Sequence, residues 1–116
     1  MAKPLTNSLG ITSSAETVWN LLTAADGIAD WYDDWESVVD YQGPQGFLHV
    51  GSTFRLLRRG TSAWCRVTVA DPPHRLRWLE IADDGDAVAV EFRLERDGTD
   101  GTVVTHTKTL IARDAH

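Results

Sequence analysis

The sequence has little cysteine and no long apolar run. Among its 116 residues there is one cysteine, Cys65, so no disulfide can form within the chain and the fold does not need an oxidising compartment. The apolar runs are only a few residues long, too short to span a membrane. Residues 1–6 lack the apolar stretch of a secretory signal. We therefore expect a cytoplasmic protein with no membrane partner.

Basic residues are scarce in the first half of the chain. Between Lys3 and Arg55 every charged residue is acidic, and nine of the eleven lysines and arginines lie from Arg55 to Lys108. The formal net charge of −6 disfavours nucleic acid as a partner, because that binding depends on neutralising phosphates. Such segregation could orient a partner or a ligand, although a solvated helical surface is its commoner meaning.

The remaining composition is typical of a folded globular protein. Hydrophobic residues make up 42% of the chain and charged residues 24%, so disorder is disfavoured. A chain of this length can bury one core. No internal repeat, low-complexity tract or linker divides the sequence. We expect residues 1–116 to form a single domain.

The first third of the sequence predicts one strand and two short helices. Residues 5–11 are predicted as a strand. Ser13, followed three residues later by Glu16, fits a capping box with Ser13 as the N-cap of a helix. Apolar residues recur at helical spacing over residues 15–25. After a turn, a second, shorter helix is predicted at residues 28–32.

From residue 35 on, the pattern changes to strands separated by turn residues. Regular strand–turn–strand spacing favours an antiparallel meander over parallel βαβ units. The prediction is an α+β fold, with two short helices after the first strand and an antiparallel sheet of about six or seven strands. The later strands are predicted at residues 35–41, 53–59, 62–70, 75–82, 87–96 and 102–111.

Alternation along the strands assigns their side chains to two faces of the sheet. One set of positions carries most of the sheet's arginine, glutamate and threonine, and is predicted to face water. The opposite set is mostly apolar and is predicted to face the core, although four polar residues interrupt it. The apolar members are Phe54, Leu56, Ala63, Cys65, Val67, Val69, Leu76, Trp78, Val88, Val90, Phe92, Leu94 and Val104; the four interruptions are Arg58, Glu80, His106 and Lys108.

Several short motifs, taken in order, resemble the START-like (SRPBCC, Bet v 1-like) superfamily. They are Val18-Trp19 in the first helix, Trp31 near the second, Gly51-Ser52-Thr53-Phe54 opening a strand, the Asp71-Pro72-Pro73-His74 turn and Asp100-Gly101-Thr102 before the last strand. The resemblance spans about residues 5–110 and covers the polyketide cyclase/dehydrase and Hsp90-ATPase-activator branches. It implies a helix-grip fold, in which a curved antiparallel sheet and short helices enclose an apolar pocket.

The end of the sequence departs from this resemblance. Members normally finish with a long helix that closes the pocket, whereas only residues 112–116 follow the last predicted strand, so that helix is expected to be missing or truncated. Either the chain is a trimmed version, or a second copy or another partner covers the concave face. An uncovered apolar face would be large for a monomer. We therefore predict self-association as a homodimer.

Polar residues on the predicted core face are the candidate catalytic groups. A buried polar group needs a partner or a ligand. Glu80 and His106 are therefore interpreted as a proton-transfer pair acting on a carbonyl-bearing substrate, with Arg58 as a third candidate. The alternative is that these residues pair with one another or lie near water at the ends of the sheet. The predicted ligand-binding residues are Trp31, Tyr32, Trp35, Phe54, Val67, Trp78, Phe92 and Val104.

The resemblance implies a protein that binds a small hydrophobic or aromatic molecule, with a polyketide cyclase/dehydrase-like reaction left open. The alternatives are a non-enzymatic carrier or sensor, and an interaction module similar to the C-terminal domain of the Hsp90-ATPase activator. The four histidines lack metal-ligand spacing, and no glycine loop resembles a phosphate cradle, so neither metal nor cofactor is expected. Trp64, on the predicted wet face, marks either a dimer contact or a lone exposed aromatic.

Overall fold

The computed structural model describes residues 5–32, 34–98 and 100–112, which form one antiparallel sheet with helices against one of its faces. The seven strands lie in the order β1-β7-β6-β5-β4-β3-β2. The strands are β1 (Leu5–Ile11), β2 (Ser37–Gln42), β3 (Thr53–Arg58), β4 (Thr61–Asp71), β5 (Arg75–Ala82), β6 (Ala87–Asp97) and β7 (Gly101–Ala112). The helices are α1 (Ala15–Thr23), the 3₁₀ turn η1 (Ala25–Gly27) and α2 (Ile28–Trp31).

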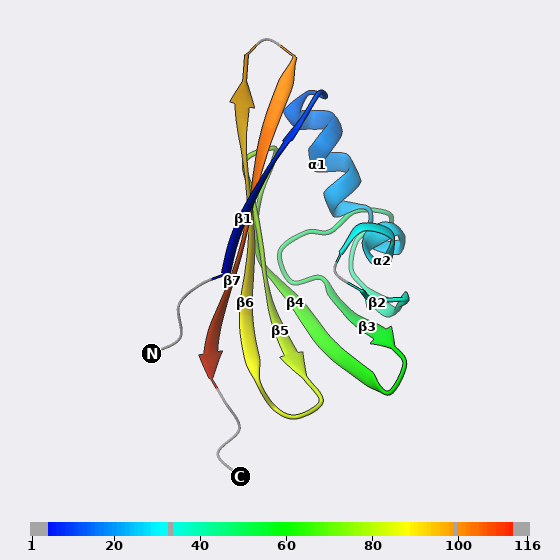
Figure 1. The fold of residues 1–116 in the computed structure, drawn as a ribbon. Helices are drawn as coiled ribbons and strands as arrows, with labels where there is room; N and C mark the ends of the chain where they lie inside the picture. The colour runs from blue at the N-terminus through cyan, green and yellow to red at the C-terminus, as the bar shows by residue number, and fades with distance from the viewer. Residues whose placement is uncertain (1–4, 33, 99, 113–116) are drawn as a thin grey trace.

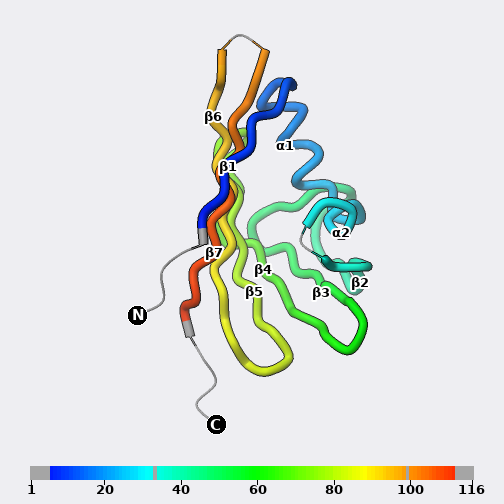
Figure 2. The backbone as a smooth tube through the Cα atoms, viewed as in Figure 1, coloured from blue at the N-terminus to red at the C-terminus, as the bar shows by residue number. Residues whose placement is uncertain are grey.

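The helices cover one face of the curved sheet and leave the other face open (Figure 1). Each of the strands from β2 to β6 pairs with the next one in the chain. The first strand, β1, lies beside β7, from the other end of the sequence (Figure 2). The expected α+β class, antiparallel pairing and two short helices after the first strand are thus confirmed. No helix within the described residues is long and apolar enough to cross a membrane.

The N-cap of α1 is one residue later than the sequence pattern predicted. Ser14, not Ser13, has the extended backbone of a cap, and its hydroxyl accepts a hydrogen bond from the Thr17 amide at 3.2 Å. The carbonyl of Ser13 instead accepts a hydrogen bond from the Thr102 hydroxyl at 2.7 Å. Ser13 is therefore tied to the sheet, and the helix can begin only after it.

The predicted division of the strands into two faces is confirmed by burial. The side chains of Phe54, Leu56, Val67, Leu76 and Trp78 are almost fully buried beneath the helices. Val69 is an exception, because a bulge in β4 shifts the register between residues 67 and 69 and places Val69 opposite Arg77. Val69 is consequently only half-buried, a correction to its predicted place on the core face.

Aromatic rings fill the centre of the core. The Trp78 ring meets Phe54 and Tyr32 edge-to-face, with centroids 5.4 and 5.2 Å apart, and Phe92 at 5.4 Å. Such pairs contribute about 0.5–1.5 kcal/mol each beyond the area they bury. The first helix adds Val18 and Trp19 to this core. The central strands are therefore packed solid against the helical layer.

Replacing the two serines before α1 separately tests the position of the cap. We expect Ser14→Ala to lower the free energy of unfolding by about 1 kcal/mol, because the Thr17 amide loses its acceptor. The matched control Ser13→Ala keeps the backbone carbonyl that binds Thr102, so its effect should stay below about 0.5 kcal/mol. Urea unfolding followed by circular dichroism measures both. A larger loss for Ser13→Ala would place the cap at Ser13.

Candidate ligand cavity

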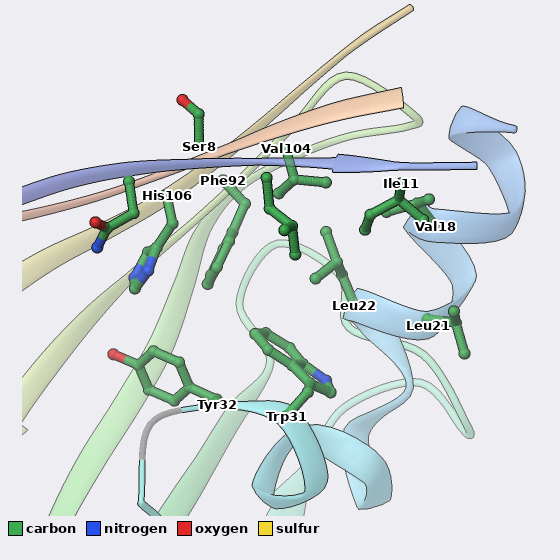
Figure 3. Close-up of a pocket in the computed structure, with 12 residues that line it drawn as sticks. Ser8, Ile11, Val18, Leu21, Leu22, Trp31, Tyr32, Phe92, Val104 and His106 are labelled. Atoms are coloured by element: carbon green, nitrogen blue, oxygen red, sulfur yellow. The ribbon is translucent and has the colours of Figure 1, made fainter. Parts of the chain in front are cut away.

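A cavity of about 440 Å³ lies between the helices and the β1–β7–β6 edge of the sheet. Figure 3 shows side chains from both layers pointing toward it. It lies beside the solid core and not within it, because the rings around Trp78 occupy the space beneath the central strands. Its lining is Asn7, Ser8, Leu9, Ile11, Val18, Leu21, Leu22, Trp31, Tyr32, Phe92, Val104 and His106.

The sheet side of the cavity is formed by two stacked rings and a valine. Phe92 on β6 and His106 on β7 are directly opposite in the strand register. Their rings lie nearly parallel, 10° apart, with centroids at 4.6 Å. Val104 lies two residues before His106 on the same face of β7. The result is a flat wall with one imidazole at its end.

The opposite side is formed by the residues that end α2. Trp31 meets the Phe92 ring edge-on at 5.3 Å, and Tyr32 meets the His106 ring at 5.8 Å. Val18 and Leu22 on α1 complete the apolar lining (Figure 3). Leu9 on β1 and Leu21 on α1 are 65% and 63% exposed, so they form the mouth where the cavity meets solvent.

Behind Tyr32 lies a buried carboxylate. Glu80 Oε1 accepts hydrogen bonds from the Tyr32 hydroxyl at 2.9 Å and from Trp78 Nε1 at 3.3 Å. The ammonium of Lys108 lies 4.8 Å from the centroid of the Tyr32 ring, at cation–π distance. Tyr32 therefore contacts Glu80, Lys108 and His106, and links the cavity wall to the charged groups behind it.

The single cysteine, Cys65, lies close to these charged groups, but its thiol is expected to be unreactive. Burial, and secondarily the negative charge of Glu80, raise the pKa of the Cys65 thiol far above its usual range, while Lys108 acts in the opposite direction. A thiol that stays protonated is a poor nucleophile. Cys65 therefore serves as a small core residue, as the sequence indicated.

Half of the predicted ligand-binding residues line the cavity. Trp31, Tyr32, Phe92 and Val104 do so, together with His106 from the predicted catalytic set. The other four, Trp35, Phe54, Val67 and Trp78, belong to the solid core.

The other two predicted catalytic residues lie outside the lining. Glu80 is buried behind Tyr32. Arg58 is exposed at the end of β3, with its guanidinium 4.6 Å from the Trp35 ring centroid. The structure thus brings Glu80 and His106 to either side of Tyr32 and leaves Arg58 elsewhere.

Sequence reasoning missed the contribution of the first strand and helix to the cavity. Ile11, Val18 and Leu22 all line it. The signal was present for Val18 and Leu22, which belong to the apolar stripe of the predicted helix. All three of Val18, Trp19 and Leu22 belong to the core, and nothing in the local pattern indicated that Val18 and Leu22 also reach the cavity while Trp19 does not.

Fold and cavity together define a helix-grip protein of the START-like (SRPBCC, Bet v 1-like) superfamily. Within it, residues 12–116 match the family described as Activator of Hsp90 ATPase homolog 1-like protein, and the chain belongs to that family. No curated protein matches the sequence.

Solved structures of similar fold come from several kinds of protein. DynU16, of the dynemicin biosynthetic locus, superposes with a TM-score of 0.73 at 16% identity, over 99% of this chain and 40% of its own. The Aha1 dimer from Colwellia psychrerythraea gives 0.70 at 23% identity, over 97% and 79%. Norcoclaurine synthase from Thalictrum flavum gives 0.70 at 18% identity, over 91% and 67%. At these identities the likeness establishes the fold, and this chain spans less than half the length of DynU16.

A double-mutant cycle tests the link between Tyr32 and Glu80. Tyr32→Phe removes the hydroxyl that Glu80 accepts from, leaving a buried carboxylate with one fewer donor, so we expect a loss of about 1–3 kcal/mol in unfolding free energy. Combined with Glu80→Ala, which removes the acceptor of the same bond, the two changes should couple by about 0.5–3 kcal/mol, because they remove one interaction. Urea unfolding of the four proteins gives the coupling. Additive effects would show that the bond contributes nothing.

Proposed function

We propose that this protein binds a small hydrophobic or aromatic molecule in the cavity. The observation that carries the proposal is an apolar space of about 440 Å³ walled by Trp31, Phe92 and Val104 and open to solvent at one end. Pockets for small organic ligands are mostly apolar, with a few placed polar groups, and measure about 300–1,000 Å³. The cavity meets both conditions.

The lining also favours one orientation of the ligand. Apolar side chains from α1 and β1, including Val18 and Ile11, surround one end, whereas the His106 imidazole and the nearby Asn7 lie at the other. A ligand with an apolar body and one polar group would place that group toward His106. This arrangement suits an aromatic compound that carries a hydroxyl or a carbonyl group.

The same arrangement supports proton transfer to a carbonyl-bearing ligand. His106 is the group to move the proton, because an imidazole both gives and takes protons near neutral pH. Glu80 acts one step removed, as the acceptor that orients Tyr32 beside the imidazole. A carrier or sensor would use the same cavity without this step. Norcoclaurine synthase, of similar fold, is an enzyme by name.

A second candidate function is a protein-interaction module acting on an Hsp90-type ATPase. The family description favours it, and the Aha1 structure shares the fold. Such a module would act through its surface. A substitution that fills the cavity and leaves the surface intact therefore separates the two candidates, because only ligand binding would be lost.

A substitution that fills the cavity tests the leading proposal. The measurement is binding of N-phenyl-1-naphthylamine, a neutral aromatic dye whose fluorescence rises in apolar surroundings. We expect the dye to bind saturably to the wild type. The variant Val104→Trp should weaken binding at least about tenfold, because the added ring occupies the ligand's space. Val103→Trp, next along β7 on the opposite face of the sheet, should bind the dye as the wild type does.

Unchanged binding by Val104→Trp, or equal losses in both variants, would contradict the proposal. Circular dichroism confirms that each variant is folded. A measurement on the wild type guards against a folding defect, since dye bound in the cavity should shift the NMR signals of the Val104 methyl groups and the His106 ring. Shifts confined to other regions would contradict the proposal equally well.

We also propose that a second copy of the chain covers the cavity mouth. The two leucines there, Leu9 and Leu21, are among the most exposed large apolar side chains described in the chain. Leu9 belongs to β1 and Leu21 to α1, and β1 is an edge strand with no other described strand on its outer side. A dimer of similar fold is known in Aha1.

Charged substitutions at the mouth test this association. We expect a dimer at micromolar concentration in sedimentation velocity, and at least about a tenfold weaker dimer for Leu9→Asp combined with Leu21→Asp, because the charges would be buried at the interface. The matched control is Val50→Asp, an equally exposed apolar residue outside the cavity lining. A monomeric wild type, or an equal effect of the control, would refute the arrangement.

A further inference from the structure

One face of the sheet is covered by no helix (Figure 1), and the strand register places arginines around an apolar centre on it. Arg55 lies opposite Trp64, and Trp64 lies opposite Ile81. One step further along the same strands, Arg66 lies opposite Leu79. With Arg77, two residues before Leu79 on β5, they form a continuous outer band: Arg55, Trp64, Arg66, Arg77, Leu79 and Ile81.

The apolar centre of the outer band is accessible to solvent, and its tryptophan is restrained by a neighbouring arginine. Trp64 is 45% exposed and Ile81 43%, and Leu79 beside them is half-buried. The Arg55 guanidinium lies 4.3 Å from the centroid of the Trp64 ring, which holds the indole against the sheet. Tryptophan and arginine dominate binding energy at protein interfaces, and a side chain already held in place loses less entropy on binding.

The acidic residues near the outer band do not neutralise all of its cations. Glu91 binds Arg75 at 2.7 Å and Arg93 at 2.9 Å, and Asp40 lies 3.8 Å from Arg55. Asp83, also close to Arg55, accepts its hydrogen bonds from Ser62. Across the ranges that the structure describes, Arg66 and Arg77 form no ion pair. Two cations thus remain available beside the apolar centre.

We propose that the outer band docks an acidic segment of another protein, with a large apolar side chain of that segment on Trp64 and Ile81 and its carboxylates paired with Arg66 and Arg77. Local charge complementarity favours this partner, since Arg66 and Arg77 flank the apolar centre and form no ion pair within the described residues. A nucleic acid would pair with the arginines through its phosphates without using the apolar centre. The outer band lies on the opposite face from the cavity, so the proposal is independent of ligand binding.

A second copy of the chain fits this surface poorly. Its exposed acids are scattered: Glu16 and Asp30 lie on the helices, on the other side of the sheet from the outer band, whereas Glu95 lies on β6. Pairing one face with the opposite face of the next copy would not close, and would build an open chain of molecules. A separate acidic partner avoids this consequence.

The test uses a fluorescein-labelled peptide of alternating glutamate and leucine as the probe, and fluorescence anisotropy as the measurement. We expect saturable binding that weakens as sodium chloride is raised from about 50 to about 300 mM. Arg66→Glu combined with Arg77→Glu should weaken it at least about tenfold, and Trp64→Ala should do so by a similar factor. The matched control Arg96→Glu, an exposed arginine near the end of β6, should bind as the wild type does.

Four outcomes would overturn the proposal. They are no saturable binding of the probe at low salt, an equal loss in the Arg96→Glu control, equal binding of a peptide with glutamine in place of glutamate, and tighter binding of an RNA oligonucleotide than of the peptide. Salt-sensitive self-association abolished by Trp64→Ala, without peptide binding, would replace the acidic partner by a second copy. Because Val104→Trp alters only the cavity, it should leave peptide binding unchanged, which separates this result from failure of the ligand proposal.

Discussion

The hydrogen bond from the Tyr32 hydroxyl to the buried carboxylate of Glu80 joins the helical layer to the sheet. The helix that Tyr32 follows, α2, is four residues long, and so short a helix does not persist without tertiary contacts. Glu80 in turn needs donors, because burying a carboxylate without partners is costly. The one hydrogen bond gives α2 a tertiary contact and gives Glu80 a donor. The position of the cavity wall made by Trp31 and Tyr32 therefore depends on the Glu80 carboxylate, which is buried behind that wall.

The location of the cavity follows from the distribution of bulky side chains across the concave face. Large aromatic residues on β3, β5 and β6 fill the space under the centre of the sheet, with Phe54 and Trp78 fully buried. On β1 and β7 the inward positions around the cavity include smaller side chains, such as Val104 and Ile11. The space left by this change in volume is the cavity. A single alternating pattern thus produces both a packed core and a binding site.

The alternation itself was readable from the sequence because it depends only on neighbouring residues. It predicted the strands closely, and it placed Trp64 on the open face and Trp78 inside. It could not say how far along the sheet a cavity would open, so Phe54 and Trp78 were grouped with Phe92 although only Phe92 meets the cavity. Which of these rings meets the cavity depends on Tyr32, which follows α2 and packs against Trp78.

Two other differences between prediction and structure arise from contacts that are distant in the sequence, which a local pattern does not contain. Ser13 and Ser14 are chemically identical, and the choice between them as the cap is made by Thr102, 89 positions away, which binds the Ser13 carbonyl. The bulge in β4 could not be read from the sequence, because no glycine or proline lies between Val67 and Val69. In both cases a contact with another strand decides the geometry.

The pairing of the first and last strands connects the fold to the site. Thr6 and Thr107, which face each other across β1 and β7, are 101 positions apart in the sequence, and their side chains approach to 3.4 Å. Such distant pairing carries a large loop-closure cost and must be stabilised by what it buries. Ile11 on β1 and Val104 and His106 on β7 meet the α1 and α2 side chains only once this pairing exists. Any molecule held in the cavity would consequently bind only the sheet in which β1 and β7 are paired, and would stabilise that pairing by the free energy of its binding.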